Sequence, residues 1–176
     1  MLTTYQEVLN QLRKKVKELE REVKKIIASY CPQEFLLLKS ISGIGDRVAA
    51  ALLAMLNGFE YFDNAKEVYS FCGLSPSPYQ SGETVQKEKG IMKKGNRYLR
   101  KMLYLAALSA SRYNPDCKRL YQRLLSKGKP KKVALVAVAN KLLRQAFAVV
   151  KSGMPYDPNY LEEKMNLLPQ TTWLLT

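Results

Sequence analysis

Residues 133–151 read VALVAVANKLLRQAFAVVK, and this stretch decides the fold that we expect for the chain. As a helix it is apolar on nearly every face, and apart from Lys151 at its end its polar side chains are Asn140, Lys141, Arg144 and Gln145. A helix that is apolar almost all round belongs in the interior of a domain. We therefore expect a central core helix here, with other helices packed around it.

Turn and capping signals divide the preceding sequence into further helices. The Lys-Gly-Lys-Pro run at residues 127–130 separates the core helix from an earlier helix, which starts at residues 114–115 with an asparagine cap and a proline in the first turn. A Gly-Asn pair opens another helix over residues 95–113. A shorter helix is expected at residues 63–71, capped by its first residue, an aspartate. The fold class predicted from these signals is all-α.

Apolar side chains near the N-terminus recur in a strict 4-3 spacing, which is typical of a coiled coil over three heptads. The seam consists of Tyr5, Leu9, Leu12, Val16, Leu19, Val23 and Ile26. Charged residues fill the positions between them, so the seam is narrow and favours pairing with another helix or subunit, although the helix could instead pack on its own domain. It should end near Pro32, because proline cannot continue a helix.

These patterns divide the chain into three parts. We expect a coiled-coil linker helix at residues 1–31, a compact helical domain at residues 33–153 and a tail at residues 154–176. Residues 74–90 lack a helical pattern and are rich in proline and glycine, so they are expected to form one long loop, with a short strand pair around residues 83–87. Long loops in compact domains are often functional.

Composition excludes several classes of function. The 176 residues include no histidine, which excludes Ser-His-Asp hydrolysis, Cys-His proteolysis and zinc sites with histidine ligands. The three cysteines, Cys31, Cys72 and Cys117, have no paired spacing, so we expect free thiols, no metal site and a reducing compartment, the cytoplasm. Apolar runs such as residues 48–56 are shorter than the ~20 residues that a membrane span needs, and no membrane partner is expected.

Positive charge is concentrated in one segment. The formal net charge is +14, and residues 89–156 alone carry 17 basic side chains and one acidic side chain, Asp116. Such a segment is typical of a surface that binds a polyanion, and nucleic acid is the leading partner. A solubilising face is a weaker interpretation, because the segment also carries apolar runs that must fold around a core. An anionic membrane surface is weaker too, because no single helix shows the strongly amphipathic, aromatic-rich face that it would need.

A hairpin of two helices offers the first candidate site. Residues 38–45 read LKSISGIG and precede a helix rich in small residues that begins at Asp46. This pattern resembles a helix-hairpin-helix motif, in which glycines bring the backbone close to a phosphate and free N–H groups at the second helix bind it. The site residues are then Gly43, Gly45 and Arg47. A plain helical hairpin without a ligand is the alternative interpretation.

Four ordered motifs carry a more specific resemblance. They are Gly-Leu-x-Pro at residues 73–76, Gln-Ser-Gly at 80–82, Lys-x-Gly-Asn-x-x-Leu-Arg-x-x-Leu at 93–103 and Ala-x-Lys-Leu-Leu at 139–143. Together they resemble the C-terminal transposase domain of the IS110 family of insertion-sequence transposases, which are bridge-RNA-guided DNA recombinases related to site-specific DNA invertases. The resemblance covers about residues 35–151, and the N-terminal helix resembles the coiled-coil linker of that family.

The resemblance implies a role for particular residues. Ser81 matches the family's covalent nucleophile on DNA, and the chemistry fits, because a hydroxyl that attacks a phosphodiester needs nearby cations. The nucleic-acid contacts expected beside it are Lys93, Lys94, Asn96, Arg97, Arg100 and Lys101. In the family a RuvC-like domain with acidic ligands for a divalent metal such as Mg precedes the coiled coil and supplies the proton acceptor. This chain starts at the linker helix, so we expect it to hold no cofactor and to be inactive alone.

The same resemblance implies DNA, a guide RNA and a second copy of the chain as partners.

Other interpretations of the sequence remain open. Ser81 and Gly82 could form an ordinary turn, Ser75 and Ser77 are rival hydroxyls, and Tyr79 could suggest a tyrosine recombinase. The chain could then be a non-catalytic helix-hairpin-helix module that binds DNA or RNA, or a coiled-coil fragment that inhibits a full-length transposase by pairing with it.

Overall fold

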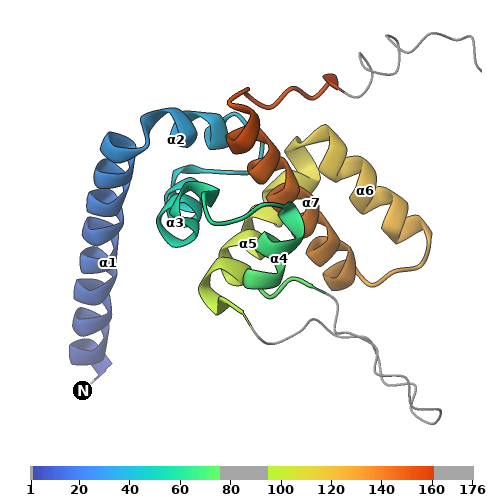
Figure 1. The fold of residues 1–176 in the computed structure, drawn as a ribbon. Coiled ribbons are helices and arrows are strands. Elements are labelled where there is room, and N and C mark those ends of the chain that lie inside the picture. The colour runs from blue at the N-terminus through green and yellow to red at the C-terminus, as the bar shows by residue number, and fades with distance from the viewer. Residues whose placement is uncertain (1, 76–94, 161–176) are drawn as a thin grey trace, which may run out of the picture.

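The computed structural model describes residues 2–75 and 95–160, and these residues form seven α-helices and one short 3₁₀ helix, with no strand in this part of the chain (Figure 1). The elements are α1 (Leu2–Tyr30), α2 (Pro32–Lys39), α3 (Asp46–Leu56), η1 (Asn57–Phe59), α4 (Ala65–Phe71), α5 (Arg97–Tyr113), α6 (Pro115–Ser126) and α7 (Lys131–Ser152). The all-α prediction is confirmed. The predicted strand pair at residues 83–87 lies outside the described residues.

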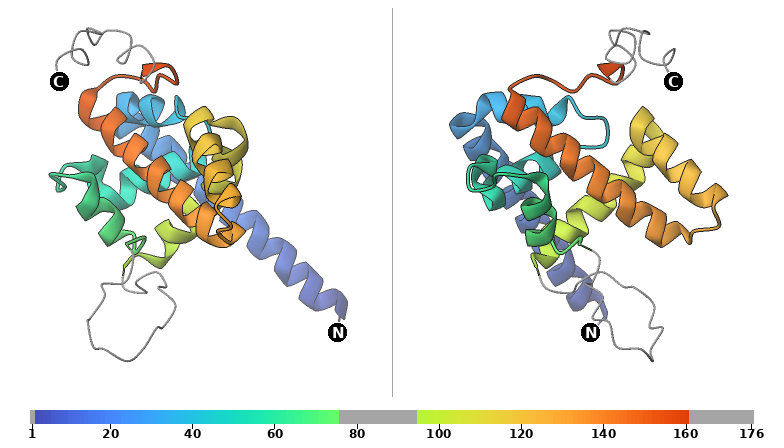
Figure 2. Two further views of the ribbon diagram at one scale, coloured as in Figure 1. Left: turned by 90° about the vertical axis from the view of Figure 1, so that its right-hand side faces the viewer. Right: turned by 45° about the vertical axis from the view of Figure 1, so that its right-hand side comes forward.

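Helix α7 is the centre of the domain, as predicted. It packs against α5 and α6 on one side and against α2, α4 and η1 on the other (Figure 2). Its buried residues recur at helical spacing: Ala134, Leu135, Val138, Ala139, Leu142, Leu143, Ala146 and Val149. By length and composition alone α7 could also cross a membrane, whereas the apolar runs in the sequence had led us to expect no membrane span. Here its apolar residues form the middle of the hydrophobic core.

Asparagine side chains start three of the helices. Asn114 accepts a hydrogen bond from the N–H group of Cys117, so the predicted cap is confirmed, and Asn96, in the pair expected to open a helix, caps α5 by accepting hydrogen bonds from Tyr98 and Leu99. The predicted Asp63 cap of α4 is wrong by one residue. Asn64 is the N-cap, because its side chain lies 3.1 Å from the Glu67 backbone nitrogen.

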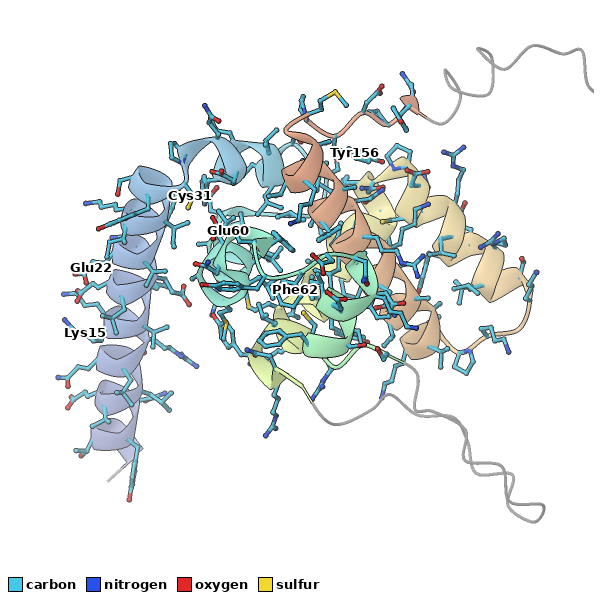
Figure 3. The ribbon with its side chains drawn as sticks, viewed as in Figure 1. Lys15, Glu22, Cys31, Glu60, Phe62 and Tyr156 are labelled. Atoms are coloured by element: carbon cyan, nitrogen blue, oxygen red, sulfur yellow. The ribbon has the colours of Figure 1, made fainter. Side chains whose placement is uncertain are left out.

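A buried polar network joins the corner between α5 and α6 to α7. Asn114 is fully buried, and its amide donates to the Gln145 side chain on α7 over 3.1 Å. The Tyr156 hydroxyl lies 3.2 Å from the Asn114 side-chain oxygen and 3.1 Å from the Asp116 carboxylate. Tyr156 therefore holds the segment after α7 against the domain, and Figure 3 shows it between α6 and the end of α7.

Helix α1 lies along one edge of the domain and contacts α2 and α3 (Figure 1). Glu20 forms an ion pair with Arg47 over 2.6 Å, and Lys24 pairs with Asp46. Lys15 and Glu22 lie on the side of α1 that faces away from the domain (Figure 3). The seven seam residues are between 43% and 70% exposed, so their apolar surface is largely uncovered within one chain.

Candidate nucleic-acid interface

The two ends of the segment 76–94 are held together by described residues on both sides. The Asn96 backbone N–H donates to the Phe71 carbonyl oxygen over 2.8 Å. Gly95 packs directly on Gly73: a Cβ atom at Gly95 would lie 2.6 Å from the Gly73 nitrogen, and Gly95 has φ +120°. Only glycine tolerates this backbone conformation and this proximity. The chain therefore leaves and re-enters the described structure at one point, at the start of α5.

Two side chains hold the outgoing end of this segment. The Arg100 guanidinium donates to the Gly73 carbonyl oxygen over 3.4 Å, and the Asn140 amide donates to the Leu74 carbonyl oxygen over 3.1 Å. We call these contacts, together with those of Phe71, Gly95 and Asn96, the loop clamp. Sequence reasoning placed Asn140 among the polar positions of the core helix but gave it no role. The available signal was an amide that directly follows the apolar run at residues 133–139.

Three cations gather at the first turns of α5. Arg97 and Lys101 are exposed and one helical turn apart, whereas Arg100 is half-buried in the loop clamp. The first turn of α5 carries no acidic residue. Cations at this end of a helix are repelled by the partial positive charge of the helix dipole, which favours anions there. The arrangement is therefore unfavourable for the isolated helix and suited to binding a phosphate.

The predicted hairpin residues lie elsewhere on the domain. Gly43 has φ +109° and packs on Ala110, near the end of α5. Ala110 is 13 residues after Arg97, so the two ends of α5 are about 20 Å apart along the helix axis. Gly45 is exposed and starts α3. The phosphate-binding role predicted for this hairpin stays a prediction. Its two helices and their glycine connection are present as expected.

Charges at the start of α3 are paired within the chain. The hydrogen bonds that Lys24 and Lys39 donate to Asp46 lower the pKa of its carboxyl group. Arg47 forms an ion pair with Glu20 of α1. The structure thus links this hairpin to α1, and it groups Asn96, Arg97, Arg100 and Lys101 separately at the start of α5. Ser81, Lys93 and Lys94 lie outside the described residues, as do Ser77 and Tyr79.

Other nucleophiles in the described part of the chain are poorly placed for chemistry. Burial raises the pKa of Cys72 and of Cys117 to about 12, so both remain protonated thiols, and all three cysteines are free as predicted. Ser75 is 8% exposed, and its hydroxyl lies 2.8 Å from that of Ser70. Burial and the Asp116 carboxylate raise the pKa of the Tyr156 phenol.

No group of three Cys, Asp or Glu side chains that could hold a metal ion occurs among residues 2–75 and 95–160. The family resemblance implies a divalent metal for the acidic domain that precedes the coiled coil in that family, and not for these residues.

Comparison with known proteins gives a consistent result. Residues 36–122 match the family described as "Transposase IS116/IS110/IS902 family". The pilin gene-inverting protein of Moraxella lacunata is 35% identical over 123 residues, which cover 69% of this chain and 38% of that protein. The uncharacterized 43.6 kDa protein of insertion element IS110 from Streptomyces coelicolor is 30% identical over 121 residues, with 69% and 30% covered. The chain thus matches about a third of the length of these relatives.

Proposed function

Because this chain belongs to the IS116/IS110/IS902 transposase family through residues 36–122, we propose that it is the DNA-binding and strand-cleaving part of a transposase or DNA invertase. The observation that carries the proposal is the loop clamp. It fixes Gly73, Leu74 and Asn96, which flank the segment that contains Ser81, at the start of α5, the helix that carries Arg97 and Lys101. A nucleophile and the cations that bind its phosphate substrate must lie close together.

Each group has a distinct part in the proposed reaction. Arg97 and Lys101 bind a backbone phosphate of DNA, and Ser81 supplies the attacking hydroxyl. The bond from Ser81 Oγ to phosphorus forms as the bond from phosphorus to one deoxyribose oxygen breaks, and the sugar leaves as an alcohol after taking up a proton. The family resemblance assigns the serine proton to a carboxylate of the acidic domain. We also propose a guide RNA as a second nucleic-acid partner, and we propose that the protein acts inside the cell.

Replacing both Arg97 and Lys101 by glutamine is expected to weaken binding of the chain to duplex DNA. Loss of two phosphate contacts should lower the slope of log Kd against log salt concentration by about 1.8. Arg100 is left intact because it holds Gly73 in the loop clamp. The measurement is fluorescence anisotropy of labelled duplex DNA and of a structured RNA across a salt series.

A matched control removes the same charge elsewhere. Lys14→Gln with Lys17→Gln changes two exposed cations of α1 and should leave the slope unchanged. If the α5 variant and this control bind DNA equally, the α5 cations are not the interface. Binding of RNA without DNA would favour the non-catalytic module over the strand-cleaving enzyme.

We also propose that α1 pairs with the same helix of a second chain. The support is its uncovered seam: Leu12 is 60% exposed and Leu19 is 49% exposed, although both occupy core positions of a heptad pattern. Val16, Leu19 and Val23 line an open apolar groove of about 390 Å³ against α3 and Tyr98.

Replacing Leu12 and Leu19 by asparagine should therefore convert an oligomer into monomers, because two buried polar groups would interrupt the seam. Light scattering coupled to size-exclusion chromatography measures the mass directly. Leu36→Asn with Val133→Asn is the control, since these residues are exposed apolar positions on α2 and α7. An oligomer that persists in the seam variant would exclude α1 as the interface.

A further inference from the structure

The helical hairpin formed by α6, residues 127–130 and α7 carries positive charge that the proposed interface does not use. Residues 117–156 contain ten basic side chains and no aspartate or glutamate, and all of them lie in the described structure. The ten are Lys118, Arg119, Arg123, Lys127, Lys129, Lys131, Lys132, Lys141, Arg144 and Lys151. We call the part from residue 118 to residue 141 the basic arm.

Cations line both walls of a groove along the basic arm. Arg119 and Arg123 are one turn apart on α6, and Lys141 faces them from α7 across a groove of about 310 Å³. Asp116 lies at the same groove and pairs with Arg119 over 2.9 Å and with Lys141 over 3.6 Å. One carboxylate therefore orients two of the cations but neutralises only one charge.

Four lysines stand at the turn of the basic arm. Lys127, Lys129, Lys131 and Lys132 are all exposed. The first turn of α7 holds no acidic residue, and its N-cap, Pro130, makes no side-chain capping bond. Like charges crowded at this end of a helix repel one another and the helix dipole. Figures 1 and 2 show the connection from α6 to α7 at the outer edge of the domain, away from α1 to α4.

We propose that the basic arm is a second surface for the sugar-phosphate backbone of a double-helical nucleic acid, carried by different helices from the α5 cations. The inference rests on the proposed function, since it assigns a further contact to the same substrate class. Lys118 and Lys127 lie nine residues apart, which is about 14 Å along a helix. An equal length of duplex carries about eight phosphates.

The chemistry of the arm fits phosphates better than a protein partner. Protein interfaces depend on aromatic and apolar anchors that become buried at their centre. The exposed face of the arm between residues 118 and 132 consists mainly of lysine, arginine, glutamine and serine, and the nearest large apolar side chain that is exposed is Val133. Lysines without such anchors act as point charges, which bind a phosphate backbone without sequence specificity.

The test replaces Lys129, Lys131 and Lys132 together by glutamine in the full chain. Three lost phosphate contacts should lower the slope of log Kd against log salt by about 2.7 and weaken binding at least about 10-fold at physiological salt. The control is Lys14→Gln with Lys17→Gln and Lys25→Gln, which removes the same charge from exposed positions of α1. Thermal unfolding of each variant verifies that the fold is intact.

Duplex DNA and duplex RNA of one sequence are the two probes. Weaker binding of either probe by the arm variant, but not by the control, supports the proposal and identifies the nucleic acid that the arm holds. If the arm variant and the control behave alike while the Arg97 and Lys101 variant loses affinity, the arm proposal fails and the proposed function stands. If the unmodified chain binds neither duplex, both fail.

Discussion

Replacing Ser81 by alanine is expected to reduce DNA strand cleavage by at least about 10³-fold, because the covalent route loses its nucleophile. The described alternatives are unsuitable: Ser75 is buried against Ser70, and the buried thiols of Cys72 and Cys117 have a pKa of about 12. The expected effect on DNA binding is small, since an alanine removes no charge.

The experiment needs an active protein. We would join the chain to the part of the Moraxella lacunata relative that lies outside the matched region, which covers 38% of that protein, and assay the chain alone in parallel. Denaturing gels detect DNA that is covalently attached to protein. Ser77→Ala is the matched control, because it removes a hydroxyl from the same loop. Recombination that survives in the Ser81 variant, or that disappears in the Ser77 variant, would refute the assignment of the nucleophile.

Replacing Gly43 by alanine is expected to destabilise the fold by about 3–5 kcal/mol, since the cost of a positive φ adds to that of overpacking. The new Cβ would lie 2.6 Å from the Cβ of Ala110 and 2.8 Å from its Cα, so the loop between α2 and α3 must move away from α5. Urea unfolding followed by circular dichroism measures the change.

Gly45 is the matched control for this prediction. It lies two residues away in the same connection, and no atom lies within 4 Å of a Cβ placed there. Gly45→Ala should therefore cost only about 1 kcal/mol, which is the loss expected when alanine replaces glycine at a helix N-cap. The pair also separates structural from functional roles, because both glycines were expected to contact a phosphate. A Gly43→Ala variant with unchanged stability and lost DNA binding would contradict the packing role.

Local signals predicted the helices well because their causes are local. The caps Asn96 and Asn114 each bond to backbone groups two or three residues away, and the apolar spacing of α7 is a property of that helix alone. The one error, Asp63 for Asn64, concerns two neighbouring residues that can both cap a helix, and the backbone geometry selects between them.

Contacts between distant residues could not be predicted in this way. Nothing near Gly43 in sequence indicates that Ala110 lies against it, and nothing near Asn140 indicates Leu74. Charge was the least predictable feature at the candidate sites. Arg47 and Arg100 are expected to bind nucleic acid, and that expectation stays a prediction; the sequence did not indicate that Arg47 also pairs with Glu20 or that Arg100 also donates to a backbone carbonyl.

The loop clamp has a consequence for how such a protein can change over time. Its contacts join residues on either side of the segment 76–94 directly to one another and to α5 and α7. Insertions, deletions or exchanges within that segment then cost the framework little, because closing a longer loop adds only slowly to the entropy of folding. The sequence of the segment 76–94 can therefore change during evolution, and with it the chemistry of that segment, while the helical scaffold stays the same.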